Sequence, residues 1–222
     1  YPKSKRELLK GDRHYDVDDQ KLPSVTTILQ ATQDAEKAES LKRWTQKVGQ
    51  VEAERIKNQA AKRGTAMHSY LETYIQGGKV LDLRDVGREA SSMAETIMEK
   101  GFGDLEEVWG SEVTLFYPNL YAGATDLCGI YQGRESIIDF KQSNKPKKAE
   151  WIGDYKLQMV AYAMAHNCVY GTGIEQGVIL MCTPDNLFQK FTINGREFRE
   201  LKWEWLKRVD QYYVTNKSQS VA

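Results

Sequence analysis

Two short segments carry two carboxylates and one amine at a spacing that could bind a metal ion. Asp126 follows a run of small residues, and Asp139 and Lys141 lie at the end of a short apolar run one hairpin later. Side chains alternate along a strand, so Asp139 and Lys141 share one face while Phe140 lies on the other. If Asp126 lies across the hairpin, two repelling carboxylates meet and favour a divalent cation with oxygen ligands. The alternative is a solvated Asp–Lys pair without function.

Two further pairs of polar residues are spaced one helical turn apart. His68 and Glu72 share a face of a long helical segment, and Gln158 and Tyr162 do the same on a later, largely apolar segment. The His-Glu-x-x-His pattern of zinc proteases is absent. Each pair is equally compatible with a structural role, as a satisfied histidine or as the polar edge of a buried helix.

The elements that must position these residues follow from the hydrophobic pattern. An apolar run such as residues 136–140 is typical of a buried central strand, and Gln132-Gly133-Arg134 indicates the turn before it. Ser24 is a candidate cap at the start of a first helix. We expect helices near residues 35–47, 50–76, 86–100, 149–170 and 195–215, and strands near 108–117, 121–131, 136–140, 176–181 and 188–193. The pattern predicts an α/β fold with a central mixed sheet flanked by helices.

Length and composition limit the class of protein. The 222 residues fit a single domain, 1–222, with a mainly helical part at 1–105 and an α/β core at 106–222. We expect no membrane segment and no signal peptide. The three scattered cysteines match no metal spacing and suggest a reducing, cytoplasmic setting. The 31 basic and 31 acidic residues cancel, so any contact with nucleic acid must be local. Neither charge nor motif specifies an oligomeric state.

Four motifs in order resemble the PD-(D/E)XK nuclease superfamily in its RecB-like branch. They are Gly64-Thr65-x-x-His68, Gly123-x-x-Asp126, Ile138-Asp139-Phe140-Lys141 and Gln158-x-x-x-Tyr162. Further segments are similar to the mitochondrial genome maintenance exonuclease family and to related phage exonucleases: Leu22-Pro23-Ser24-Val25-Thr26, Leu41-x-Arg43-Trp44 and the run from Ile138 to Lys147. The resemblance covers most of the chain. The cysteines of the iron–sulfur-bearing branch are missing.

The resemblance implies metal-dependent hydrolysis of DNA phosphodiester bonds. Asp126, Asp139 and the Phe140 carbonyl would hold one or two Mg²⁺ or Mn²⁺ ions. His68 would complete the ligand set, with Glu72 orienting it, and a nitrogen ligand suits Mn²⁺ better than Mg²⁺. Lys141 would position or deprotonate the attacking water and stabilise charge on the phosphate. Supporting residues would be Glu112, Gln158 and Tyr162, with Glu112 a candidate for orienting a metal-bound water.

Candidate DNA contacts lie in three places. Lys145, Lys147 and Lys148 follow the catalytic strand, where Gln142 and Ser143 could add neutral donors. Ser24 and Thr26 could bind a phosphate at a helix start. Within the part that resembles an arch over the strand, Arg43 could contact DNA and Trp44 could stack on a base. Each set has a plainer reading as a solvated loop, a cap or a packing residue.

The sequence therefore predicts a DNA exonuclease that favours single-stranded or frayed ends, a preference that comes from the resemblance. We expect a phage protein in the host cytoplasm, with an organellar matrix as the alternative, serving DNA replication, recombination or degradation. Three other functions stay open. They are a structure-specific endonuclease on the same fold, an inactive nucleic-acid-binding relative, and a metal hydrolase of small phosphates.

Overall fold

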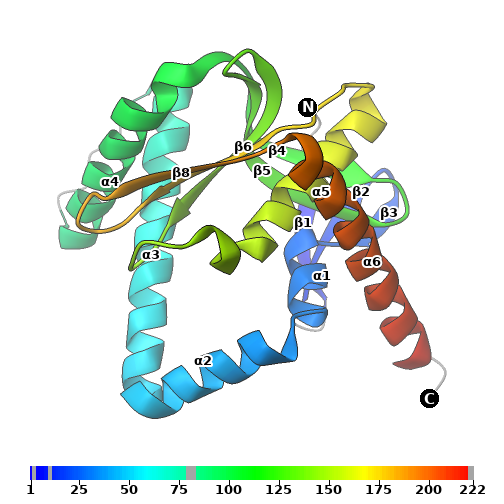
Figure 1. Ribbon diagram of the computed structural model, residues 1–222, viewed down its shortest axis with the longest axis horizontal. Coiled ribbons are helices and arrows are strands. Elements are labelled where there is room, and N and C mark those ends of the chain that lie inside the picture. The colour runs from blue at the N-terminus through cyan, green and yellow to red at the C-terminus, as the bar shows by residue number, and fades with distance from the viewer. Residues whose placement is uncertain (2–3, 10–11, 79–83, 220–222) are drawn as a thin grey trace.

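A five-stranded mixed sheet forms the centre of the protein (Figure 1). The computed structural model describes residues 1, 4–9, 12–78 and 84–219. The sheet order is β4 (Leu105–Tyr117), β5 (Tyr121–Tyr131), β6 (Arg134–Gln142), β7 (Gly177–Cys182) and β8 (Phe188–Ile193). Only β6 and β7 are parallel; the other neighbours are antiparallel. The predicted α/β class with a mixed central sheet is confirmed.

Helices cover both faces of this sheet. They are α1 (Val25–Ala31), α2 (Ala35–Val48), α3 (Gln50–Ile75), α4 (Asp85–Gly101), α5 (Gly153–Tyr170) and α6 (Gly195–Gln219), with 3₁₀ turns η1 (Phe102–Asp104) and η2 (Ala149–Trp151). One core joins α3 and α4 to the sheet, and a second joins α1, α5 and α6 to its other face. Among the described residues, every helix is too short or too polar to cross a membrane.

Local sequence explains the β5–β6–α5–β7 path that positions the candidate site. Gln132 and Gly133 have φ of 52° and 70°, so they form the two-residue turn with positive φ that suits the twist of a hairpin. Strand β6 is buried over most of its length, as its apolar run predicts. Because β7 is parallel to β6, the chain must cross over between them, and α5 makes that crossover.

The N-terminal part contains α1 to α4 and, before them, strands that the sequence interpretation missed. It begins with a separate antiparallel sheet of β1 (Lys5–Leu9), β2 (Asp12–Val17) and β3 (Gln20–Pro23). Its strands are rich in charge, and among the side chains that the structure describes, Tyr15, Val17 and Leu22 form its core and pack on Ala122 of β5. The sheet thus depends on tertiary contact with β5, which local sequence does not reveal.

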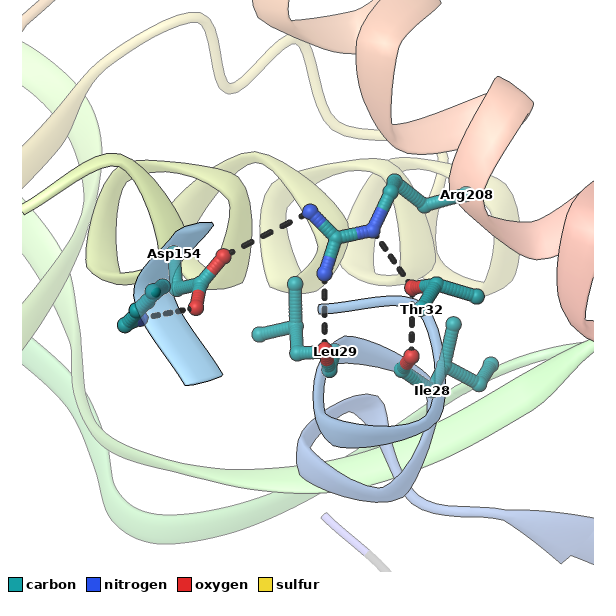
Figure 2. A network of polar contacts seen from close by, with 6 residues as sticks. Ile28, Leu29, Thr32, Asp154 and Arg208 are labelled. Atoms are coloured by element: carbon teal, nitrogen blue, oxygen red, sulfur yellow. Dashed lines mark hydrogen bonds and ion pairs between the residues drawn. The ribbon is translucent and has the colours of Figure 1, made fainter. Parts of the chain in front are cut away.

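A partly buried arginine ties the start of the α2 segment to the rest of the protein (Figure 2). Arg208 of α6 donates to the Leu29 carbonyl at 2.7 Å and to the Thr32 hydroxyl at the end of α1. It also faces the carboxylate of Asp154 in the first turn of α5, which pairs in turn with Lys37 of α2. No residue of α2 is buried, and Figure 1 shows this helix standing away from the sheet between α1 and α3. Its position therefore depends on its ends.

Gly129 of β5 offers a test of this sheet. Its position lies beside an irregularity in β4, and a Cβ there would be 1.9 Å from the Glu107 carbonyl oxygen. We expect Gly129→Ala to lower the free energy of unfolding by about 3 kcal/mol or more, since backbone must move to admit the methyl group. Urea denaturation measures this change.

Gly103→Ala is the matched control, because nothing lies within 4 Å of its added Cβ. Equal stability of the two variants would contradict the described β4–β5 packing.

Candidate metal site

The site is built where strands β5 and β6 separate. Their pairing runs from Tyr131 and Arg134 to Leu127 and Ile138 and stops there, although β6 continues alongside β7 to Gln142. Beyond that point, the Phe140 N–H donates to Asp126 Oδ2 at 2.6 Å. The Asp126 carboxylate thus takes the place of a backbone acceptor at the fork.

Asp139 and Lys141 lie next to this fork on β6. Lys141 Nζ is 2.5 Å from Asp139 Oδ2 and 5.0 Å from the centre of the Tyr155 ring of α5. Asp139 is only 2% exposed. The Phe140 side chain lies in the core beneath α3 and α4, as the alternation predicts. The structure therefore brings the two carboxylates and the amine to one place.

His68 and Glu112 complete a group that could hold a cation. His68 Nδ1 lies 3.2 Å from Asp126 Oδ1. One donor atom each from His68, Glu112 and Asp126 lie within 4.8 Å of one another. One nitrogen and two carboxylates fit Mn²⁺ or Mg²⁺ by their chemistry. Asp139 adds a second buried carboxylate next to this group, and its Oδ2 lies 2.5 Å from the Lys141 ammonium.

Glu112 has a larger place in this group than its sequence context indicates. The register pairs Ser111 with Leu127 and Val113 with Thr125, so Glu112 and Asp126 face each other on neighbouring strands. Its φ of 50° is unusual for a non-glycine residue, and such backbone strain often occurs at functional sites. The proximity of Glu112 to Asp126 follows from the pairing register of β4 and β5, which cannot be read from the sequence.

The four charged groups of the site shift one another's pKa values. Burial raises the pKa of the Asp139 carboxyl to about 7, against the attraction of Lys141. Burial also acts to raise the pKa of Asp126, but His68, Lys141 and the Phe140 N–H outweigh it and lower the pKa. For His68 and Lys141, burial acts to lower the pKa, and the carboxylates reverse this and raise it. The two carboxylates are thus balanced by His68 and Lys141, and a divalent cation bound between Asp126 and His68 would take the place of the imidazolium proton.

These residues open into a cleft of about 610 Å³. Gln158 and Tyr162 line it from α5, where the Gln158 amide donates to the Tyr162 hydroxyl at 3.0 Å. The Tyr162 ring explains the glycine of the Gly123-x-x-Asp126 motif, because a Cβ at Gly123 would lie 2.6 Å from that ring. Gly64 likewise lets α3 approach β6, where a Cβ would lie 3.3 Å from Gln142 Cγ.

Glu72 and Phe140 make contacts in the structure that differ from those predicted for them. Glu72 lines the cleft, but its carboxylate accepts from Gln76, while His68 is oriented by Asp126. For Phe140, the group that contacts the site is its N–H; the role of its carbonyl as a ligand stays a prediction.

The candidate DNA contacts divide between exposed and engaged side chains. Ser24 is 1% exposed and caps α1 by accepting from the Thr27 N–H, whereas Thr26 is exposed in the same cleft. Ser143 is buried, and its hydroxyl donates to the Lys145 carbonyl. Gln142 accepts from Arg63. These engaged groups hold the fold, which leaves them less able to contact DNA.

The remaining candidates lie at the surface. Arg43, Lys145 and Lys148 are exposed, and Lys147 and Trp44 are partly exposed. Trp44 is therefore no buried anchor of α2. The sequence interpretation missed Arg13 and Tyr15 of β2, which line the cleft on the side of the N-terminal sheet. The alternation His14-Tyr15-Asp16-Val17 is the signal that could have revealed this strand.

A mixed sheet with acidic residues at the fork of its central strands is what the resemblance to PD-(D/E)XK nucleases led us to expect. The chain is similar to mitochondrial genome maintenance exonuclease 1 of Homo sapiens, with 28% identity over 209 residues. The Mus musculus protein of the same name is 27% identical over 210 residues. Each alignment covers 90% of this chain but only about 60% of the longer relative. These homologues confirm the predicted resemblance.

Other comparisons are weaker. No protein-family model matches the chain. The crystal structure of a candidate exonuclease from Eubacterium rectale aligns with a TM-score of 0.46 and 12% identity, covering 67% of this chain and 68% of that chain.

Calorimetric titration with Mn²⁺ tests the ligand group. We expect Asp126→Asn and Glu112→Gln each to weaken Mn²⁺ binding by about tenfold or more, since each removes a charged oxygen ligand. Asp210→Asn, an exposed change on α6, is the control and should bind as the unaltered protein does. Unchanged affinity in both site variants would show that the ion binds elsewhere.

Proposed function

We propose that this protein is a deoxyribonuclease that hydrolyses phosphodiester bonds with the help of Mg²⁺ or Mn²⁺, and that it acts as an exonuclease. The observation that carries the proposal is the convergence of Asp126, Asp139 and Lys141 at the β5–β6 fork, with His68 and Glu112 within reach. The names of its homologues support the same activity. Because the chain spans about 60% of their length, the activity of this chain is a proposal.

The residues of the site would have different roles in the reaction. His68, Glu112, Asp126 and Asp139 would hold the cation, which supplies positive charge to the phosphate and acidifies water. Lys141 is held beside Asp139, and the carboxylates keep its pKa raised. It is therefore better suited to stabilise charge on the phosphate and to orient water than to remove a proton. Gln158 and Tyr162 would support the substrate from α5.

The DNA would enter along exposed polar and basic groups around the cleft. Thr26 lines it, while Lys145 and Lys147 follow β6. Arg43 and Trp44 belong to α2, the helix that stands away from the sheet. We propose a preference for single-stranded or frayed ends. The mitochondrial homologues favour an organellar setting over the phage setting for DNA replication, recombination or degradation.

Digestion of end-labelled DNA tests the activity. With Mn²⁺, we expect cleavage of linear single strands, and none of a circular single strand, because an exonuclease needs an end. Lys141→Ala and Asp126→Asn should reduce the rate by about 100-fold or more, the scale seen when charge stabilisation is removed. Thermal unfolding would confirm that the variants fold.

Lys190→Ala is the matched control, because Lys190 pairs with Asp104 on the surface, away from the cleft. A Lys141→Ala protein that cleaves at the unaltered rate would refute the role of Lys141, and rapid cleavage of circles would refute the exonuclease proposal.

A further inference from the structure

An exposed tryptophan lies in the loop between β6 and α5. Trp151 is 58% exposed at the end of η2, although burial of an indole normally stabilises a fold. Lys148 Nζ lies 5.2 Å from the ring centre, so a cation covers one face of the ring. Lys145 and Lys147 precede it, and neither forms an ion pair with a described residue. Lys148 itself pairs with Glu150 at 3.9 Å. The loop thus presents an aromatic surface near two lysines, Lys145 and Lys147, that have no acidic partner among the described residues.

Polar contacts hold the backbone of this loop in place. The Gln189 side chain of β8 accepts from the Lys147 N–H at 2.8 Å and donates to the Lys147 carbonyl at 2.9 Å. The Ser143 hydroxyl donates to the Lys145 carbonyl at 2.6 Å. Because these bonds fix the backbone, the lysine side chains extend from a prepared loop, and less ordering is needed when a ligand binds.

A buried arginine anchors the same loop to the helices. Arg63 of α3 is 5% exposed and donates to Gln142 at 3.1 Å and to Asn144, on either side of Ser143. Its third contact, at 2.9 Å, is the carboxylate of Glu89 in α4. The start of the loop is therefore tied to both helices on that face of the sheet.

The loop lies directly beside the candidate site. Tyr155, four residues after Trp151, lies under the Lys141 ammonium. Asp154 in the same turn pairs with Lys37 of α2, so α2 also reaches this edge (Figure 2). A DNA strand that leaves the cleft past Lys141 would next reach this loop between β6 and α5, with its lysines.

We propose that Trp151 stacks on an unpaired base of single-stranded DNA while Lys145 and Lys147 contact its phosphates. Stacking on an indole suits any base and requires that the base be free of its own duplex partner. The inference rests on the proposed function, and it assigns the preference for a single strand to this loop. The free face of the indole, opposite Lys148, is the one available to the base.

Binding measured without metal separates this inference from catalysis. In EDTA, fluorescence anisotropy would compare a labelled oligothymidine strand, an abasic strand of equal length and a blunt duplex. We expect Trp151→Ala to weaken binding of the oligothymidine by about tenfold or more, and to leave the other two ligands nearly unchanged. Trp151→Phe should retain most of the affinity, because it keeps a stacking ring.

Trp203→Ala is the matched control, since Trp203 of α6 is 70% exposed on another part of the surface. Equal loss of affinity for the oligothymidine and abasic strands, or no loss at all, would overturn the stacking inference. Cleavage by the unaltered protein in Mn²⁺ is scored separately. If the unaltered protein cleaves DNA while Trp151→Ala binds the oligothymidine normally, only the stacking inference fails. If the unaltered protein neither binds nor cleaves DNA, both proposals fail.

Discussion

The arrangement depends on one hydrogen bond at the point where two central strands separate. A buried backbone N–H without a partner is costly, so a fork in a sheet needs a substitute acceptor. Asp126 provides it by accepting from the Phe140 N–H at 2.6 Å. This requirement places one carboxylate near a second, Asp139, and the cationic groups of Lys141 and His68 lie beside them. A geometric need of the sheet thus creates the site at which we propose that a cation binds.

The surrounding elements are shaped to fit this fork. Because β6 and β7 are parallel, α5 must cross over the sheet, and the crossover brings Tyr155 to Lys141 and Tyr162 to the cleft. Gly123 leaves room for the Tyr162 ring, and Gly64 lets α3 approach β6 closely enough for His68 to reach Asp126. The glycines of the two motifs therefore have steric reasons that are separate from the chemistry.

Sequence patterns predicted the central sheet and the hairpin well, because the apolar period and the Gln132-Gly133 turn are local signals. They did not predict the N-terminal sheet, since its few apolar residues pack on Ala122 of a distant strand. Glu112 and Asp126 face each other because of the register between β4 and β5. The hydrogen bond from Arg63 to Gln142 depends on how α3 packs against β6. Register and helix packing follow from tertiary structure and are absent from any local pattern, whereas the alternation in β2 is a local signal that the sequence interpretation missed.

The most direct measurement of the central claim is anomalous diffraction from crystals soaked in Mn²⁺. We expect a peak at the fork, within bonding distance of His68, Glu112 and Asp126, with the Phe140 N–H still bonded to the Asp126 carboxylate. A bound ion elsewhere on the surface, with the fork unchanged and free of metal, would contradict it.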